Sequence, residues 1–153
     1  MMRRRPDRVA VLVVSWLAAA AGHEAGDYLV QSDHAAQNKQ RHEAAGYAAL
    51  AEHVVTYAAT QHAAKAMALR AAGVRPGWKA VAAGTVVEAL LHALIDDGRL
   101  LRRFAHGTGK GGFHDLSAAG VNGRMLIDQA AHKGLQIPIG ALVTTWLASR
   151  RTH

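Results

Sequence analysis

The sequence contains no cysteine, only three prolines and few aromatic residues, which make up 5% of its 153 positions. Without cysteine, disulfide frameworks, thiolate zinc fingers, iron–sulfur clusters and cysteine nucleophiles are excluded. Any metal ion must therefore bind through imidazole, carboxylate or other oxygen ligands. Alanine, in contrast, fills 33 positions, and this composition favours helix strongly over sheet. An all-β fold is excluded.

Long hydrophobic runs are also missing. The uninterrupted apolar runs cover residues 9–22, 80–87 and 137–147, and each is shorter than the roughly 20 residues that a transmembrane helix needs. The mean hydropathy of the chain is +0.00. However, polar residues that follow each run lie on one helical stripe, as expected when ionisable groups face the interior of a bundle instead of lipid. On this feature alone, a membrane bundle and a soluble alanine-rich bundle both stay open.

Periodicity predicts one all-α domain over residues 1–153, a four-helix bundle with helices at about 9–31, 47–72, 78–104 and 124–149. Residues 32–46 are polar and predict a connector, the GVRPG segment at 73–77 predicts a turn, and Pro138 predicts a kink in the last helix. The N-terminus also has the shape of a signal peptide with a cleavage site near Ala20. The polar stripe of His23, Asp27 and Gln31 favours an uncleaved first helix instead.

The formal net charge of +7 comes from basic clusters near the ends of the apolar stretches, at residues 3–8, 99–110 and 150–151. Nucleic-acid binding would explain such a charge, but zinc-finger spacing, a basic region leading into heptads and an aromatic RNA-binding strand are all missing. Basic residues that flank membrane helices explain the placement at least as well. We therefore expect membrane lipid as a partner, with nucleic acid the less favoured alternative.

Histidine and aspartate recur at helical spacing in three separate apolar segments. The pairs, each four residues apart, are His23 and Asp27, His92 and Asp96, and Asp128 and His132. Residues four apart lie on one helical face about 6 Å from each other, so each pair presents two ligands to a single ion. A buried histidine or carboxylate without a partner costs several kcal/mol. Three such pairs on apolar helices therefore predict a shared metal or polar site in the bundle core.

His53 is the natural contributor from the remaining helix, on one stripe with Tyr57 and Gln61. It is a candidate metal ligand or general base, Glu88 and Glu24 are further candidate bases, and Gln31 is a candidate hydrogen-bond partner of the ligands. The other six histidines are expected at the surface or in loops, with His114 kept in reserve because a glycine-rich segment precedes it.

Four segments together resemble a family of small bacterial and phage membrane proteins of unknown function. They are GHEAGDYLVQSDHAAQNK at 22–39, AEHVVTYAATQ at 51–61, EALLHALID at 88–96 and MLIDQAAHKG at 125–134. The family pattern is H-x-x-x-D-[YF]-x-x-Q, a histidine on the second helix, H-x-x-x-D and D-Q-x-x-H. The resemblance covers about residues 20–135 and extends more distantly to membrane-bound metal-dependent hydrolases. It implies a multi-span protein of the bacterial inner (cytoplasmic) membrane with a polar centre, formed here by His23, Asp27, Gln31, His53, His92, Asp96, Asp128 and His132.

Two further expectations concern function. Imidazole and carboxylate ligands suit Zn²⁺, Mn²⁺ or Fe²⁺, so we expect a divalent metal on His23, Asp27, His53, His92, Asp96, Asp128 and His132. The first hypothesis is a membrane-embedded metal-dependent hydrolase that acts on a phosphoester or lipid headgroup. The alternatives are a non-enzymatic membrane protein, whose metal or polar core supports binding of a protein partner or a second copy of the chain, and a soluble basic DNA-binding regulator.

Overall fold

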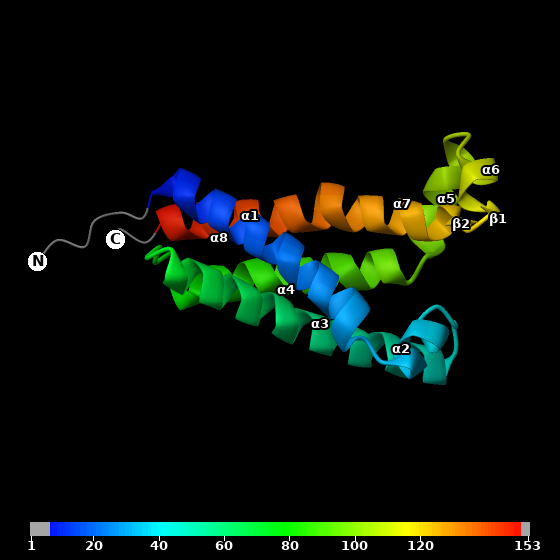
Figure 1. Cartoon of the computed structure of the whole chain (residues 1–153), viewed down its shortest axis with the longest axis horizontal. Helices are drawn as coiled ribbons and strands as arrows, with labels where there is room; N and C mark the ends of the chain where they lie inside the picture. The colour runs from blue at the N-terminus through cyan, green and yellow to red at the C-terminus, as the bar shows by residue number, and fades with distance from the viewer. Residues whose placement is uncertain (1–6, 151–153) are drawn as a thin grey trace, which may run out of the picture.

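Four long helices form the body of the protein in the computed structural model, which describes residues 7–150 (Figure 1). These helices are α1 (Arg8–Ala25), α3 (Ala44–Ala71), α4 (Trp78–Asp96) and the segment formed by α7 (Gly123–Ala131) and α8 (Ile137–Ser149). α1 packs against α3 and α8, and α4 packs against the same two helices, so the four enclose one interior. Successive long helices run in opposite directions, and both ends of the chain lie at the same end of the bundle (Figure 1). The prediction of an all-helical four-helix arrangement is confirmed.

The short elements gather at the opposite end of the bundle (Figure 1). They are α2 (Asp33–Asn38), α5 (Arg99–Gly107), α6 (Gly111–His114) and a two-stranded antiparallel hairpin, in which β1 (Ser117–Ala118) pairs with β2 (Val121–Asn122). The predicted connector at 32–46 therefore contains a helix, and the region before Gly123 holds α6 and the hairpin.

The predicted helix at 78–104 is wrong in its continuity, because α4 ends at Asp96 and α5 begins at Arg99. The chain leaves the helical conformation at Gly98, which has a φ of +78°, and resumes as α5. A left-handed residue cannot continue a right-handed helix, and glycine adopts this conformation without the steric cost that other residues carry. α5 therefore turns away from the direction of α4.

Two π-helical turns interrupt the long helices. One covers Gly26–Val30 after α1, and the other covers His132–Gln136 between α7 and α8. Because proline lacks an N–H, Pro138 cannot donate to the carbonyl of Gly134 in a regular helix, and the second π turn lies immediately before it. The predicted irregularity of the last helix thus takes the form of a π turn. α1 continues without a break through Ala20 to Ala25, and whether the chain is cleaved there stays a prediction.

The interior of this bundle is polar, whereas its outer surface is largely apolar. Buried polar side chains line all four helices, and the buried apolar residues are mainly alanines. Exposed apolar side chains follow the outer faces, including Val9, Val13 and Leu17 on α1, Val86, Leu90 and Leu94 on α4, and Leu142 and Trp146 on α8. Two segments, Arg8–Val30 and Trp78–Asp96, are long and apolar enough to cross a membrane, which is weak evidence by itself because core helices and signal sequences pass the same test.

Candidate metal centre

The structure brings the seven predicted metal ligands together in the half of the bundle that faces α2 and α5. His53 comes from α3, and His92 and Asp96 come from α4. Asp27 and His132 both lie in the π turns. A π turn inserts an extra residue into the helix and re-aims its side chains, and such turns are frequent at functional sites. The helix irregularities of this protein therefore coincide with two of its candidate ligands.

Four of these side chains converge on one point. The Nε2 atoms of His53 and His92 are 2.9 Å apart, and both lie 3.0 Å from Asp96 Oδ2. They lie 3.5 and 3.7 Å from Asp27 Oδ1, a buried oxygen that has no hydrogen-bond partner. A tetrahedral zinc ion with bonds of about 2.0–2.1 Å keeps its ligand atoms roughly 3.3 Å from one another. The observed separations lie on both sides of that value.

A second group of ligands uses the other oxygen of Asp96. His132 Nε2 lies 3.2 Å from Asp96 Oδ1 and 3.4 Å from Asp128 Oδ2. Asp96 is completely buried, and its two oxygens face different histidines. A carboxylate in this position can bridge two cations, one in each group.

Hydrogen bonds to Gln136 fix the ring orientation of two of the histidines. Its Oε1 accepts from Nδ1 of both His92, at 3.3 Å, and His132, at a shorter distance. Its Nε2 donates to the Tyr57 hydroxyl at 2.7 Å, so the amide oxygen is the atom that faces the rings. With their protons on Nδ1, neutral His92 and His132 present Nε2 lone pairs to the carboxylate of Asp96. Two sets of lone pairs at 3.0–3.2 Å repel each other unless a metal cation or a proton on the imidazole lies between them.

His23 makes contacts that differ from those of the other histidines. Its Nδ1 accepts from the Tyr57 hydroxyl at 3.3 Å, and its Nε2 donates to Gln129 Oε1 at 3.0 Å. The Gln129 amide in turn donates to Asp27 Oδ2 at 3.3 Å. Although His23 is within ligand distance of other rings, both of its nitrogens already have partners. These hydrogen bonds suit a residue that positions Asp27, where the sequence predicted a direct ligand.

Lys39, at the end of α2, is a part of the site that sequence reasoning missed. Its Nζ donates to Asp96 Oδ2 at 2.8 Å. The Gln31 amide, with its oxygen toward Lys39, accepts from the same Nζ at 3.1 Å and donates to the carbonyl of Asp27 at 3.1 Å. Gln31 thus lies beside the ligands, as predicted. The basic residue in the QNK segment of the connector was the available signal for Lys39.

The charges of the cluster do not balance when its histidines are neutral. Asp27, Asp96 and Asp128 carry three negative charges, and within residues 7–150 their only lysine or arginine ion-pair partner is Lys39. The remainder is two negative charges in a largely buried volume, and buried charge without compensation is strongly unfavourable. A divalent cation, or protonation of the histidines, is needed to neutralise it.

Both glutamates that the sequence offers as candidate general bases have cationic partners. Glu88 lies one turn before His92 and forms a completely buried ion pair with Lys65, with Nζ and Oε2 2.5 Å apart. Glu24 pairs with Lys133 at the half-exposed surface, at 2.6 Å. No described contact joins either carboxylate to the His/Asp cluster, so a catalytic role for Glu88 stays a prediction.

The cluster is open to the surface on one side. A cavity of about 360 Å³ is lined by Asp27, Asp128 and Gln129 from the site and also by Lys39 and Arg124. Since this opening lies at the α2 end of the bundle, a polar molecule can reach Asp27 and Asp128, one carboxylate of each group, without crossing the apolar surface.

His114 is buried, although the sequence predicted a loop or surface position. Its Nδ1 lies 2.6 Å from Asp115 Oδ1, and His106 Nε2 lies 3.2 Å from the other oxygen of Asp115. This arrangement is separate from the bundle interior.

The chain matches no protein-family model, no curated protein and no solved structure in the comparisons made.

Proposed function

We propose that this protein is a membrane-embedded helical bundle whose His/Asp centre binds two divalent cations and hydrolyses a phosphoester, with a lipid headgroup as the natural substrate. The bundle would lie in the cytoplasmic membrane of a bacterium. The resemblance of its motifs to membrane-bound metal-dependent hydrolases agrees with this proposal.

The distribution of polar and apolar residues supports membrane embedding. In water, an exposed apolar surface around a polar interior is unfavourable, whereas lipid favours it. α4 has 19 residues, which at 1.5 Å each give about 29 Å, close to the hydrocarbon thickness of about 30 Å. Arg8 begins α1, Arg70 lies in the last turn of α3, Lys79 lies in the first turn of α4 and Arg150 follows α8. These element ends, with the turn that contains Arg75, lie at the end of the bundle that holds the chain termini (Figure 1). Basic residues there would contact anionic headgroups.

The observation that carries the metal proposal is the arrangement of His92 and His132 around Asp96. Gln136 directs both Nε2 lone pairs toward the carboxylate, and a cation removes the repulsion. Asp27, His53, His92 and Asp96 would hold one ion. Asp96, Asp128 and His132 would hold the other and leave positions for water or substrate.

The chemistry follows from such a ligand set. A divalent cation with an open position lowers the pKa of bound water so that hydroxide forms near neutral pH. Lys39 supplies a positive charge at the mouth of the centre and would attract an anionic phosphoester. Asp27 is held by Gln129, which restricts the carboxylate to one orientation.

Turnover by the purified chain tests this proposal. Protein extracted from membranes with a mild detergent should hydrolyse a chromogenic phosphodiester or phosphomonoester when Zn²⁺ or Mn²⁺ is added. His92→Ala and Asp128→Asn should each reduce turnover by at least about 100-fold. The control is His62→Ala, since His62 is exposed on α3 outside the cluster. Bound metal without any turnover would contradict the hydrolase and leave a structural metal core. A chain recovered only from the soluble fraction would contradict membrane embedding.

A further inference from the structure

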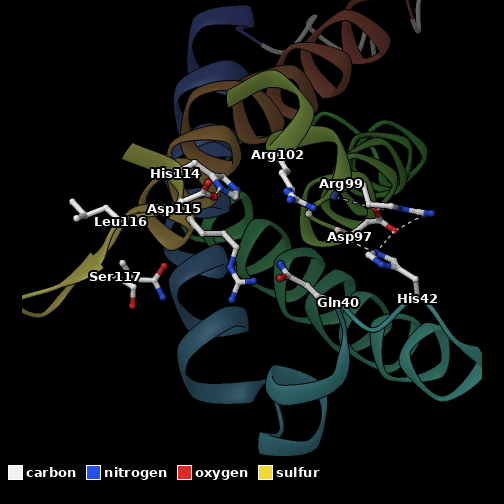
Figure 2. Close-up of a pocket in the computed structure, with 12 residues that line it drawn as sticks. Gln40, His42, Asp97, Arg99, Arg102, His114, Asp115, Leu116 and Ser117 are labelled. Atoms are coloured by element: carbon white, nitrogen blue, oxygen red, sulfur yellow. Dashed lines mark hydrogen bonds and ion pairs between the residues drawn. The ribbon is translucent and has the colours of Figure 1, made fainter. Parts of the chain in front are cut away.

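A second cavity, whose lining residues are drawn in Figure 2, shares part of its lining with the opening of the metal centre. Its volume is about 530 Å³, and its walls come from the turn between α4 and α5, from α5, from the hairpin region and from the start of α7. We call it the arginine cleft because Arg99, Arg102 and Arg124 line it.

The acidic residues of the arginine cleft are already paired. Asp97 accepts from Arg99 at 2.6 and 2.8 Å, and this guanidinium holds the pKa of Asp97 below its ordinary value. The hydrogen bond from His114 likewise lowers the pKa of Asp115. In Figure 2, each acid lies beside its own partner, with Arg102 between the two groups. Neither carboxylate therefore needs a further cation.

Two arginines of the cleft remain without an acidic partner. Within residues 7–150, neither Arg102 nor Arg124 forms an ion pair. A guanidinium presents a planar fork of N–H donors that matches the oxygens of a phosphate group. The cleft thus offers two unpaired forks in a volume that exceeds the size of a phosphate.

The arginine cleft continues into the opening of the metal centre. Gln40, Asn122 and Arg124 line both cavities. A group bound to Arg124 would therefore lie between Arg102 on one side and the carboxylates of Asp27 and Asp128 on the other.

We propose that the arginine cleft binds a phosphate group of the substrate through Arg102 and Arg124, so that the scissile phosphoester reaches the metal centre. The role of the cleft in substrate binding rests on the proposed hydrolase function. Phosphate binding itself does not require metal. A free phosphate compound and a phospholipid headgroup share the recognised chemistry, so the test must separate these two sources.

The test uses the full chain in detergent, stripped of metal by a chelator. One arm measures binding of radiolabelled inorganic phosphate by equilibrium dialysis. The other arm measures, by mass spectrometry, how much phosphatidate the protein retains from micelles that contain equal amounts of phosphatidate and phosphatidylcholine. Arg102→Ala should weaken binding at least tenfold, as expected when a charged hydrogen bond is lost. Arg102→Lys should recover only part of it, because lysine lacks the fork.

Arg103→Ala is the matched control, since Arg103 is the next residue on α5 and lines a different cavity. Binding in the first arm identifies a free phosphate compound, and binding in the second arm alone identifies a headgroup. Binding in either arm supports the proposal when the Arg102→Ala variant loses this binding and the Arg103→Ala variant keeps it. Equal binding by the wild type and Arg102→Ala, equal loss in both variants, or no binding in either arm would overturn it. The metal content of protein that has not been stripped is measured separately. It tests the metal centre independently of phosphate binding by the arginine cleft.

Discussion

The buried pair of Lys65 and Glu88 gives a prediction about stability that depends on whether one charge or both charges are removed. Both side chains are completely buried, and their charged atoms are 2.5 Å apart. The second oxygen of Glu88 has no hydrogen-bond partner. Lys65→Met removes one charge at nearly constant volume and leaves a buried carboxylate uncompensated. Breaking a buried ion pair in this way costs about 3–5 kcal/mol.

For a chain of this size, about 1 kcal/mol corresponds to roughly 2–4 °C in Tm. We therefore expect Lys65→Met to lower the Tm of the detergent-solubilised protein by about 6–20 °C, as measured by circular dichroism at 222 nm. The double variant Lys65→Met with Glu88→Gln removes both charges and should recover at least half of the loss, because an unpaired amide costs less than an unpaired charge.

Lys110→Met is the control for loss of a lysine, since Lys110 is exposed and should change the Tm by less than about 2 °C. The reasoning would be refuted if Lys65→Met behaved like this control, or if the double variant were no more stable than Lys65→Met. The first result would show that the pair does not contribute to stability. The second would show that charge is not the cause of the loss.

Three further predictions concern packing, ligand orientation and pH. Gly140→Ala would place a Cβ 2.1 Å from Glu88 Oε1 and should lower the Tm by several degrees, whereas Gly134→Ala meets no atom within 4 Å and should not. Gln136→Leu removes the acceptor for two histidine Nδ1 atoms and should weaken metal binding about 10–100-fold in a chelator competition, while Gln136→Glu should retain most of the affinity. Metal should dissociate as the pH falls from about 7 to about 5, because protons compete for imidazole ligands with an ordinary pKa of about 6.5; equal metal content at both values would contradict imidazole ligation.

Helical periodicity was enough to predict the four long helices and the side chains that meet between them. His23, His53, His92 and Asp128 lie on stripes that repeat every four residues, so the polar residues of each helix share one face and meet when those faces turn toward the interior of the bundle. The stripe continues from Asp128 through His132 to Gln136, so the same rule could have identified Gln136 as well.

Features that depend on contacts between distant segments were not predictable in this way. The ion pair of Lys39 and Asp96 joins residues 57 positions apart, and no local pattern specifies that contact. The π turn after α1 begins at Gly26, where the backbone passes so close to α3 that a Cβ would lie 2.8 Å from the Tyr57 ring. The break at Gly98 was missed because apolar residues continue on both sides of it, and this continuity outweighed the single glycine.

The metal content of the purified chain tests the central proposal most directly. Protein extracted from membranes without chelators and analysed by inductively coupled plasma mass spectrometry should contain two divalent cations per chain. His53→Ala and Asp128→Asn should each retain about one, and Asp96→Asn, which alters the shared carboxylate, should retain none. A folded, helical wild-type protein that contains no metal and takes up none from added Zn²⁺ or Mn²⁺, or an Asp96→Asn variant with unchanged metal content, would contradict the metal centre.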